Sequence, residues 1–140
     1  MAITIRVGTE ADNPKIHDLV SKITMPGPAE MCFQRQPDFF IGSRVVGDEF
    51  VMTVADDDER PDVLAGLTVI SGHDMYISGK KRRLYYSGDT RVDPFYRRRG
   101  IATALIAELQ HIAADIGAWA VFVQADYGDD PAVALYTKLG

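Results

Sequence analysis

The spacing of the apolar residues changes at Pro94, and this change constrains the fold more than any other feature of the sequence. Before Pro94, residues 50–55, 63–71 and 84–92 are rich in β-branched and aromatic side chains and are separated by turn-forming, charged segments, as consecutive strands are. After Pro94, apolar residues recur at helical spacing over residues 101–116, where Gly117 is placed to end a helix. We therefore expect three strands in an antiparallel meander, followed by a helix.

The segments after this helix predict a mixed sheet. Residues 118–125 have the composition of a strand, residues 126–131 form a polar turn, and residues 132–139 fit a last helix. A strand reached through a helical crossover runs in the same direction as the strand before the helix. We therefore expect one parallel strand pair beside the antiparallel meander.

The N-terminal part of the chain adds one strand and one helix. Residues 3–7 alternate between apolar and polar side chains, and Thr9 and Asp12 have the spacing of a capping box for a helix that continues to about Lys22. No internal repeat or low-complexity linker divides the chain. Residues 1–140 are expected to form one domain of the α+β (mixed α/β) class.

Residues 24–40 combine prolines with aromatic side chains and indicate a binding loop around a short helix. Within this loop, Phe33 is a candidate substrate contact. The single cysteine, Cys32, excludes an internal disulfide and is expected to be buried as a small apolar residue, with a nucleophilic role as the alternative. Since the three histidines are scattered along the sequence, we expect no metal site.

Basic clusters stand out in a chain whose formal net charge is -5. The K-K-R-R cluster at residues 80–83 suits a hairpin tip, and the acidic run at residues 56–59 suits a solvated turn. The sequence R-R-R-G-I-A at residues 97–102 lies where a helix beginning near Arg98 would present free backbone N–H groups and the positive end of its dipole. Arginine forks and the absent side chain of Gly100 would favour a phosphate group there, the alternative being a solvated first helical turn.

The sequence V-D-P-F-Y-R-R-R-G-I-A, residues 92–102, resembles the acetyl-CoA-binding signature of the GCN5-related N-acetyltransferases (GNAT superfamily). The order of predicted elements is similar as well, and A-x-x-L-Y-x-K-L-G at residues 132–140 matches the family's last helix. The resemblance implies a mixed sheet that splays between strands 4 and 5, with acetyl-CoA as co-substrate in the gap. Residues 123–140 are similar to the C-terminal half of the aminoglycoside 3-N-acetyltransferases, whereas the first half of the chain is not.

The resemblance also implies which residues contact acetyl-CoA. Most of them belong to the end of the strand before Pro94 and to the signature, and one lies near position 129, where the family usually has asparagine. The expected cofactor-binding residues are Thr90, Arg91, Val92, Arg97, Arg98, Arg99, Gly100, Ile101, Ala102, Thr103 and Asp129.

Acetyl transfer needs a stabilised carbonyl oxygen, a deprotonated amine and a proton for the leaving thiolate. Backbone N–H groups near Val92 are candidates for the first task. Tyr136 matches the family's tyrosine, and a phenol of pKa about 10 can protonate a thiolate; the alternative is a core tyrosine. Asp126 and Asp89 are the catalytic candidates among the carboxylates. Asp126, with Asp130, is also expected to contact the substrate, while Asp129 or Asp130 caps the last helix.

We expect an acetyl-CoA-dependent N-acetyltransferase that acts on a small primary amine. An aminoglycoside or another polyamine-like molecule is the candidate acceptor, and antibiotic resistance is the candidate biological role. A protein or peptide N-acetyltransferase and a degenerate, CoA-binding protein are the alternatives. The acidic pI of about 5.1 argues against a nucleic-acid partner, and no membrane partner is expected. The chain lacks a signal-peptide pattern, which predicts a cytoplasmic location. Relatives usually continue past K-L-G with two more strands, so the edge strand left without them predicts a homodimer.

Overall fold

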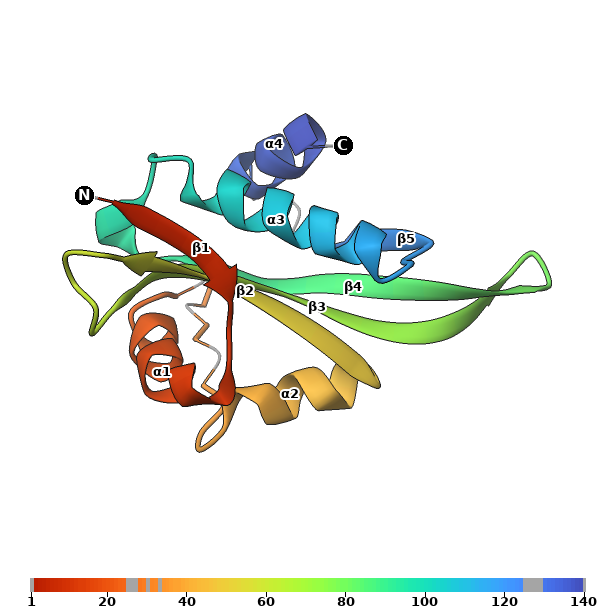
Figure 1. The fold of residues 1–140 in the computed structure, drawn as a ribbon, viewed down its shortest axis with the longest axis horizontal. Coiled ribbons are helices and arrows are strands. Elements are labelled where there is room, and N and C mark those ends of the chain that lie inside the picture. The colour runs from red at the N-terminus through yellow and green to blue at the C-terminus, as the bar shows by residue number, and fades with distance from the viewer. Residues whose placement is uncertain (1, 25–27, 30, 33, 125–129, 140) are drawn as a thin grey trace.

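The computed structural model describes residues 2–24, 28, 29, 31, 32, 34–124 and 130–139. Its strands and helices follow one another in an order close to that expected (Figure 1). They are β1 (Ile3–Val7), the 3-10 helix η1 (Glu10–Asp12), α1 (Asn13–Ser21), α2 (Phe39–Val46), β2 (Glu49–Asp57), β3 (Leu64–Ile77), β4 (Lys80–Val92), η2 (Pro94–Tyr96), α3 (Ile101–Asp115), β5 (Ala120–Val123) and α4 (Asp130–Leu139).

The strands form a five-stranded mixed sheet in the order β1-β2-β3-β4-β5. Pairing is antiparallel from β1 to β4 and parallel between β4 and β5, which confirms the mixed sheet. The parallel register runs from Leu84 opposite Ala120 to Ser87 opposite Val123, whereas β4 itself continues to Val92. The two strands therefore separate after Ser87, which confirms the splay.

Two helical layers cover the sheet (Figure 1). Helices α1 and α2 lie on one face, where Ile16, Leu19, Phe39 and Phe40 pack with Leu67 of β3 in one apolar cluster. Helix α3 lies on the other face together with α4, and its buried residues join two further clusters against β2, β3 and β4. The apolar faces of α1, α2 and α3 are thus buried against the sheet, as amphipathic spacing requires. In the described residues, no helix is long and apolar enough to cross a membrane.

Three local expectations differ from the structure. Cys32 is exposed, with its Sγ 3.5 Å from the carbonyl oxygen of Val20, and is not a buried apolar residue. The loop expected up to Phe40 ends earlier, because Asp38 caps α2 by accepting the N–H of Phe40. Helix α3 begins at Ile101 and not near Arg98, since Arg98 has a φ of 61°, outside the helical range.

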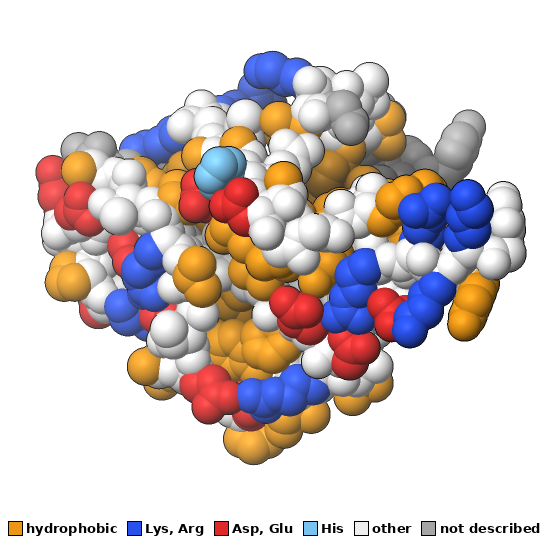
Figure 2. All heavy atoms as spheres, turned by 45° about the vertical axis from the view of Figure 1, so that its right-hand side comes forward, with side chains coloured by type: hydrophobic (Ala, Val, Ile, Leu, Met, Phe, Trp, Pro, Cys, Tyr) orange, Lys and Arg blue, Asp and Glu red, His pale blue; other side chains and the backbone are white. Residues whose placement is uncertain are grey.

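The two charged runs lie close to where they were expected but differ from the expectation in detail. Residues 80–83 belong to β4, and the hairpin turn is made by Ser78 and Gly79, both at positive φ. The acidic run is only partly solvated, because Asp57 is buried at 1% exposure and Asp56 forms an ion pair with Arg6. Acidic and basic side chains lie next to one another across the face shown in Figure 2.

Candidate active site

The loop between β4 and α3 is anchored in the core at both sides of Pro94. Asp93 donates its backbone N–H to Ala65 and accepts that of Phe95, both at 2.9 Å. The buried Tyr96 donates its hydroxyl to Asp57 at 2.6 Å. Burial raises the pKa of Tyr96, and the hydrogen bond from Tyr96 lowers the pKa of Asp57. The segment that leads into R-R-R-G is therefore fixed before it reaches the surface.

Gly100 makes the turn into α3. It is the N-cap residue with a φ of 74°, and its carbonyl oxygen accepts the N–H of Ala104 at 3.0 Å. A Cβ added at this position would meet nothing within 4 Å. The glycine is thus required by its left-handed backbone conformation rather than by a lack of space in the protein itself.

A groove of about 310 Å³ lies between the first turn of α3 and the start of α4. The first N–H groups of α3 have no acceptor within the helix, and the helix dipole adds positive charge there. Arg97 and Arg98 add two cationic side chains, so the groove suits a polyanion. The lining consists of Val92, Tyr96, Arg97, Arg98, Gly100, Ile101, Ala102, Thr103, Pro131 and Leu135.

Seven of the predicted cofactor-binding residues, those from Val92 to Thr103 other than Arg99, come together in this groove. Three others lie elsewhere in the described part of the chain. Arg99 lies over the rings of Phe95 and Tyr96, at 5.4 and 5.9 Å from their centroids. Arg91 donates from Nη1 to the carbonyl oxygen of Thr90 at 3.0 Å, and the Thr90 side chain faces α4. The remaining predicted residue, Asp129, lies outside the described residues.

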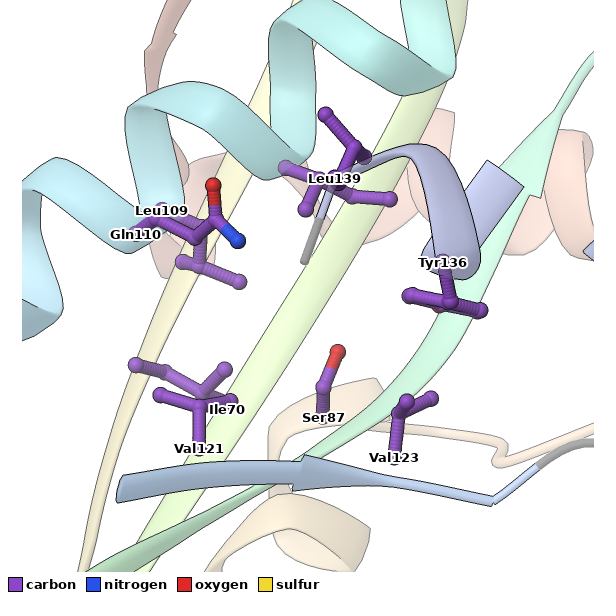
Figure 3. Close-up of a pocket in the computed structure, with 9 residues that line it drawn as sticks. Ile70, Ser87, Leu109, Gln110, Val121, Val123, Tyr136 and Leu139 are labelled. Atoms are coloured by element: carbon purple, nitrogen blue, oxygen red, sulfur yellow. The ribbon is translucent and has the colours of Figure 1, made fainter. Parts of the chain in front are cut away.

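Tyr136 of α4 lies beside the splayed part of β4. Its hydroxyl is 2.9 Å from Oγ1 of Thr90, and its side chain lines a second, mostly apolar cavity of about 80 Å³. Figure 3 shows Tyr136 from α4 and Ser87 from β4 directed into this cavity, with Val121 and Val123 of β5 beside them. Tyr136 thus contacts both the apolar cavity and the strand β4, which borders the gap in the sheet.

Asp89 occupies a β-bulge in β4. Leu67 pairs with Arg91 and Val69 with Gly88, so Asp89 and Thr90 together oppose the one residue between Leu67 and Val69. Asp89 has a φ of 57°.

The carboxylate of Asp89 pairs with Nη1 of Arg35 at 2.5 Å. The Arg35 guanidinium also lies 5.1 Å from the ring centroid of Phe39, at the start of α2. Sequence reasoning missed Arg35, because nothing local marks an arginine whose partner is 54 residues away.

Three further site residues were predicted, namely Asp126, Asp130 and Phe33. Asp126 and Phe33 lie outside the described residues, and Asp130 is the first residue of α4. Among the side chains that are described, no group of three or more His, Cys, Asp or Glu residues could hold a metal ion.

A sequence model of the Acetyltransferase (GNAT) family matches residues 15–140. The chain therefore belongs to the GNAT acetyltransferase family, whose members use acetyl-CoA. The groove fits that co-substrate, since free N–H groups and arginines are what a diphosphate requires. A comparison with curated proteins finds no match.

Several solved structures have the same fold. An acetyltransferase of Trypanosoma brucei is 22% identical with a TM-score of 0.74, over 99% of this chain and 92% of that one. An aminoglycoside acetyltransferase from an uncultured soil metagenomic sample is 26% identical with a TM-score of 0.68, over 100% and 91%. AAC(6')-Iy in complex with the bisubstrate analog CoA-S-monomethyl-acetylneamine is 20% identical with a TM-score of 0.74, over 100% and 90%.

Proposed function

We propose that this protein transfers the acetyl group of acetyl-CoA to a primary amine of a small molecule. The observation that carries the proposal is the polyanion groove at the start of α3, which lies on the same splayed strand end as the Thr90–Tyr136 hydroxyl pair. Membership of the GNAT family supports acetyl transfer in general. The groove and the hydroxyl pair support particular residues as candidates for donor binding and for proton donation.

In this proposal, different residues bind acetyl-CoA, stabilise the carbonyl oxygen and donate the proton. The N–H groups of Ile101 to Thr103, with Arg97 and Arg98, bind the diphosphate of acetyl-CoA, which supplies the activated acetyl group. Beyond Ser87, β4 has left β5, so the backbone N–H groups on that side of β4 near Val92 can stabilise charge on a carbonyl oxygen. Tyr136 donates the proton that the leaving thiolate needs.

We propose an aminoglycoside or another polyamine-like molecule as the acceptor, with antibiotic resistance as the biological consequence. Support comes from the resemblance of residues 123–140 to aminoglycoside acetyltransferases and from the soil aminoglycoside acetyltransferase of the same fold. The carboxylates proposed to attract the amine or to act as base are Asp126, Asp130 and Asp89, and Phe33 is a proposed contact. A protein or peptide amine, and CoA binding without turnover, are the competing outcomes.

A thiol-release assay tests the proposal. Acetyl-CoA is offered with aminoglycosides, polyamines, amino acids and peptides to the wild type and to Tyr136→Phe. We expect turnover with a polyamine-like acceptor and a loss of kcat of about 10²-fold or more in the variant, the usual contribution of a general acid.

Two results would count against this proposal. Full activity in Tyr136→Phe would remove Tyr136 as the acid, whatever the acceptor. CoA binding in calorimetry without turnover on any amine would favour the degenerate protein.

A homodimer in the cytoplasm, without nucleic-acid or membrane partners, also stays a proposal.

A further inference from the structure

Three hydroxyl groups form a continuous hydrogen-bonded chain from the interior of the sheet to α4. Oγ1 of Thr68 in β3 lies 2.8 Å from Oγ1 of Thr90 in β4, and Oγ1 of Thr90 lies 2.9 Å from the hydroxyl of Tyr136 in α4. Thr68 is fully buried, whereas Thr90 and Tyr136 are partly exposed. The chain thus begins in the core and ends at the proposed acid.

The β-bulge in β4 is what places Thr90 on this face. Ser87 lines the cavity beside Tyr136, and in a regular strand residues 89 and 91 would share its face while residue 90 would point away. The extra residue of the bulge reverses this alternation after Gly88. As a result, Thr90 reaches Tyr136, while Asp89 reaches Arg35.

The direction of the hydrogen bonds decides what the chain can do. Each hydroxyl both donates and accepts, so the chain can run from Thr68 through Thr90 to Tyr136 or in the reverse direction. In the first direction, Thr90 donates to the phenol oxygen, and the phenolic hydrogen is left free to point away from β4. Once Tyr136 has given up that proton, its oxygen can only accept, and only the first direction then satisfies all three groups.

We propose that Thr90, supported by Thr68, is a positioning residue that directs the proton of Tyr136 toward the leaving group and stabilises the phenolate that remains. The inference rests on the proposed role of Tyr136. As the acetyl C–S bond breaks and the C–N bond forms, the Tyr136 proton goes to the thiolate sulfur. The amine loses one proton to solvent, directly or through one of the proposed carboxylate bases, and the phenolate regains one from solvent, so the proton balance closes.

Thr90→Val tests this inference because it removes the hydroxyl and keeps both the backbone N–H and the branched shape. A hydrogen bond to a charged group is worth enough for kcat to fall about 10-fold, with the KM for acetyl-CoA unchanged. Thr90→Ser should restore most of the activity, and Thr68→Val should cost about 2-fold because it acts through Thr90. In the Tyr136→Phe background, Thr90→Val should have no further effect on kcat.

A second readout needs neither substrate. Urea unfolding of the ligand-free proteins should show that Thr90→Val lowers the midpoint less in the Tyr136→Phe background than in the wild type, because the partner hydroxyl is already gone. Thr53→Val is the matched control, since the buried Thr53 hydroxyl donates to the carbonyl oxygen of Leu105 at 3.1 Å. It should lower the midpoint equally in both backgrounds and leave kcat unchanged.

The outcomes separate this inference from the proposed function. If Tyr136→Phe loses activity but Thr90→Val keeps the wild-type kcat, the positioning role is wrong and the acid assignment stands. If the two substitutions are additive in both kcat and the urea midpoint, the hydroxyls are not coupled and the inference fails. Full activity in Tyr136→Phe would overturn the proposed acid and this inference with it, even if the urea experiment still showed coupling.

Discussion

Gly100 and Gly117 sit at the two ends of α3 in the same backbone conformation, with φ values of 74° and 80°. An added Cβ would meet nothing within 4 Å at either position. Alanine at either position therefore costs stability only through the strain of a left-handed conformation, about 1–2 kcal/mol. The two residues differ in one respect, which is that Gly100 lines the proposed diphosphate groove.

This difference allows a test of the groove in which Gly117 serves as the matched control for Gly100. Gly100→Ala and Gly117→Ala should lower the free energy of unfolding by similar amounts, but only Gly100→Ala should weaken CoA binding, because relief of its strain would move the N–H groups that we propose bind the diphosphate. Calorimetric titration with CoA checks this, beside urea unfolding. Equal CoA affinity in the two variants would mean that the turn at Gly100 does not shape the site.

The Tyr96–Asp57 pair gives a pH-dependent test of the anchor beneath the groove. The hydrogen bond from Tyr96 lowers the pKa of Asp57 below its ordinary value of 3.8. A carboxyl whose folded pKa is lowered stabilises the fold above its unfolded pKa, and this contribution is lost as the pH falls through the folded value.

Tyr96→Phe removes that contribution. The difference in urea midpoint between the wild type and Tyr96→Phe should therefore be largest near pH 7 and should shrink when both proteins are measured near pH 3. A difference that stays the same at both pH values would assign the effect of Tyr96 to packing alone.

At the scale of elements, much of the fold follows from the spacing of apolar residues. The helical spacing after Pro94 is followed by a strand, so the chain must cross over from β4 to β5 through a helix. Such a crossover leads to the parallel pairing of β4 with β5. The capping box at Thr9 and Asp12 is present as well. These features are local or follow from chain connectivity, which is why the sequence alone could indicate them.

The parts that could not be predicted depend on contacts between distant residues. The bulge at Asp89 and Thr90 reverses which side chains face α4, and no residue in β4 signals it, because Asp89 is stabilised there by Arg35 from the segment before α2. The hydroxyl chain needs Thr68, Thr90 and Tyr136 from three separate elements. Sequence reasoning could therefore select Tyr136 as a candidate but could not identify what holds it.

At the scale of the whole molecule, β5 is the edge of the sheet in the described residues, and this edge is apolar. Trp119, Val121, Phe122 and Val123 are all exposed, Phe122 at 43%. An edge strand offers unpaired backbone groups, and exposed apolar side chains beside it favour pairing with a second chain. This combination supports the proposed homodimer, with β5 as its proposed interface.

Sedimentation or light scattering across the micromolar range tests this arrangement. The wild type should have the mass of a dimer, and Phe122→Lys should shift it toward the monomer by placing an unpaired charge in the interface. Val45→Lys is the control, because Val45 is an apolar residue of α2 that is 81% exposed and lies on the opposite layer. A monomeric wild type would rule out the dimer, whereas a dimer weakened only by Val45→Lys would move the interface from β5 to α2.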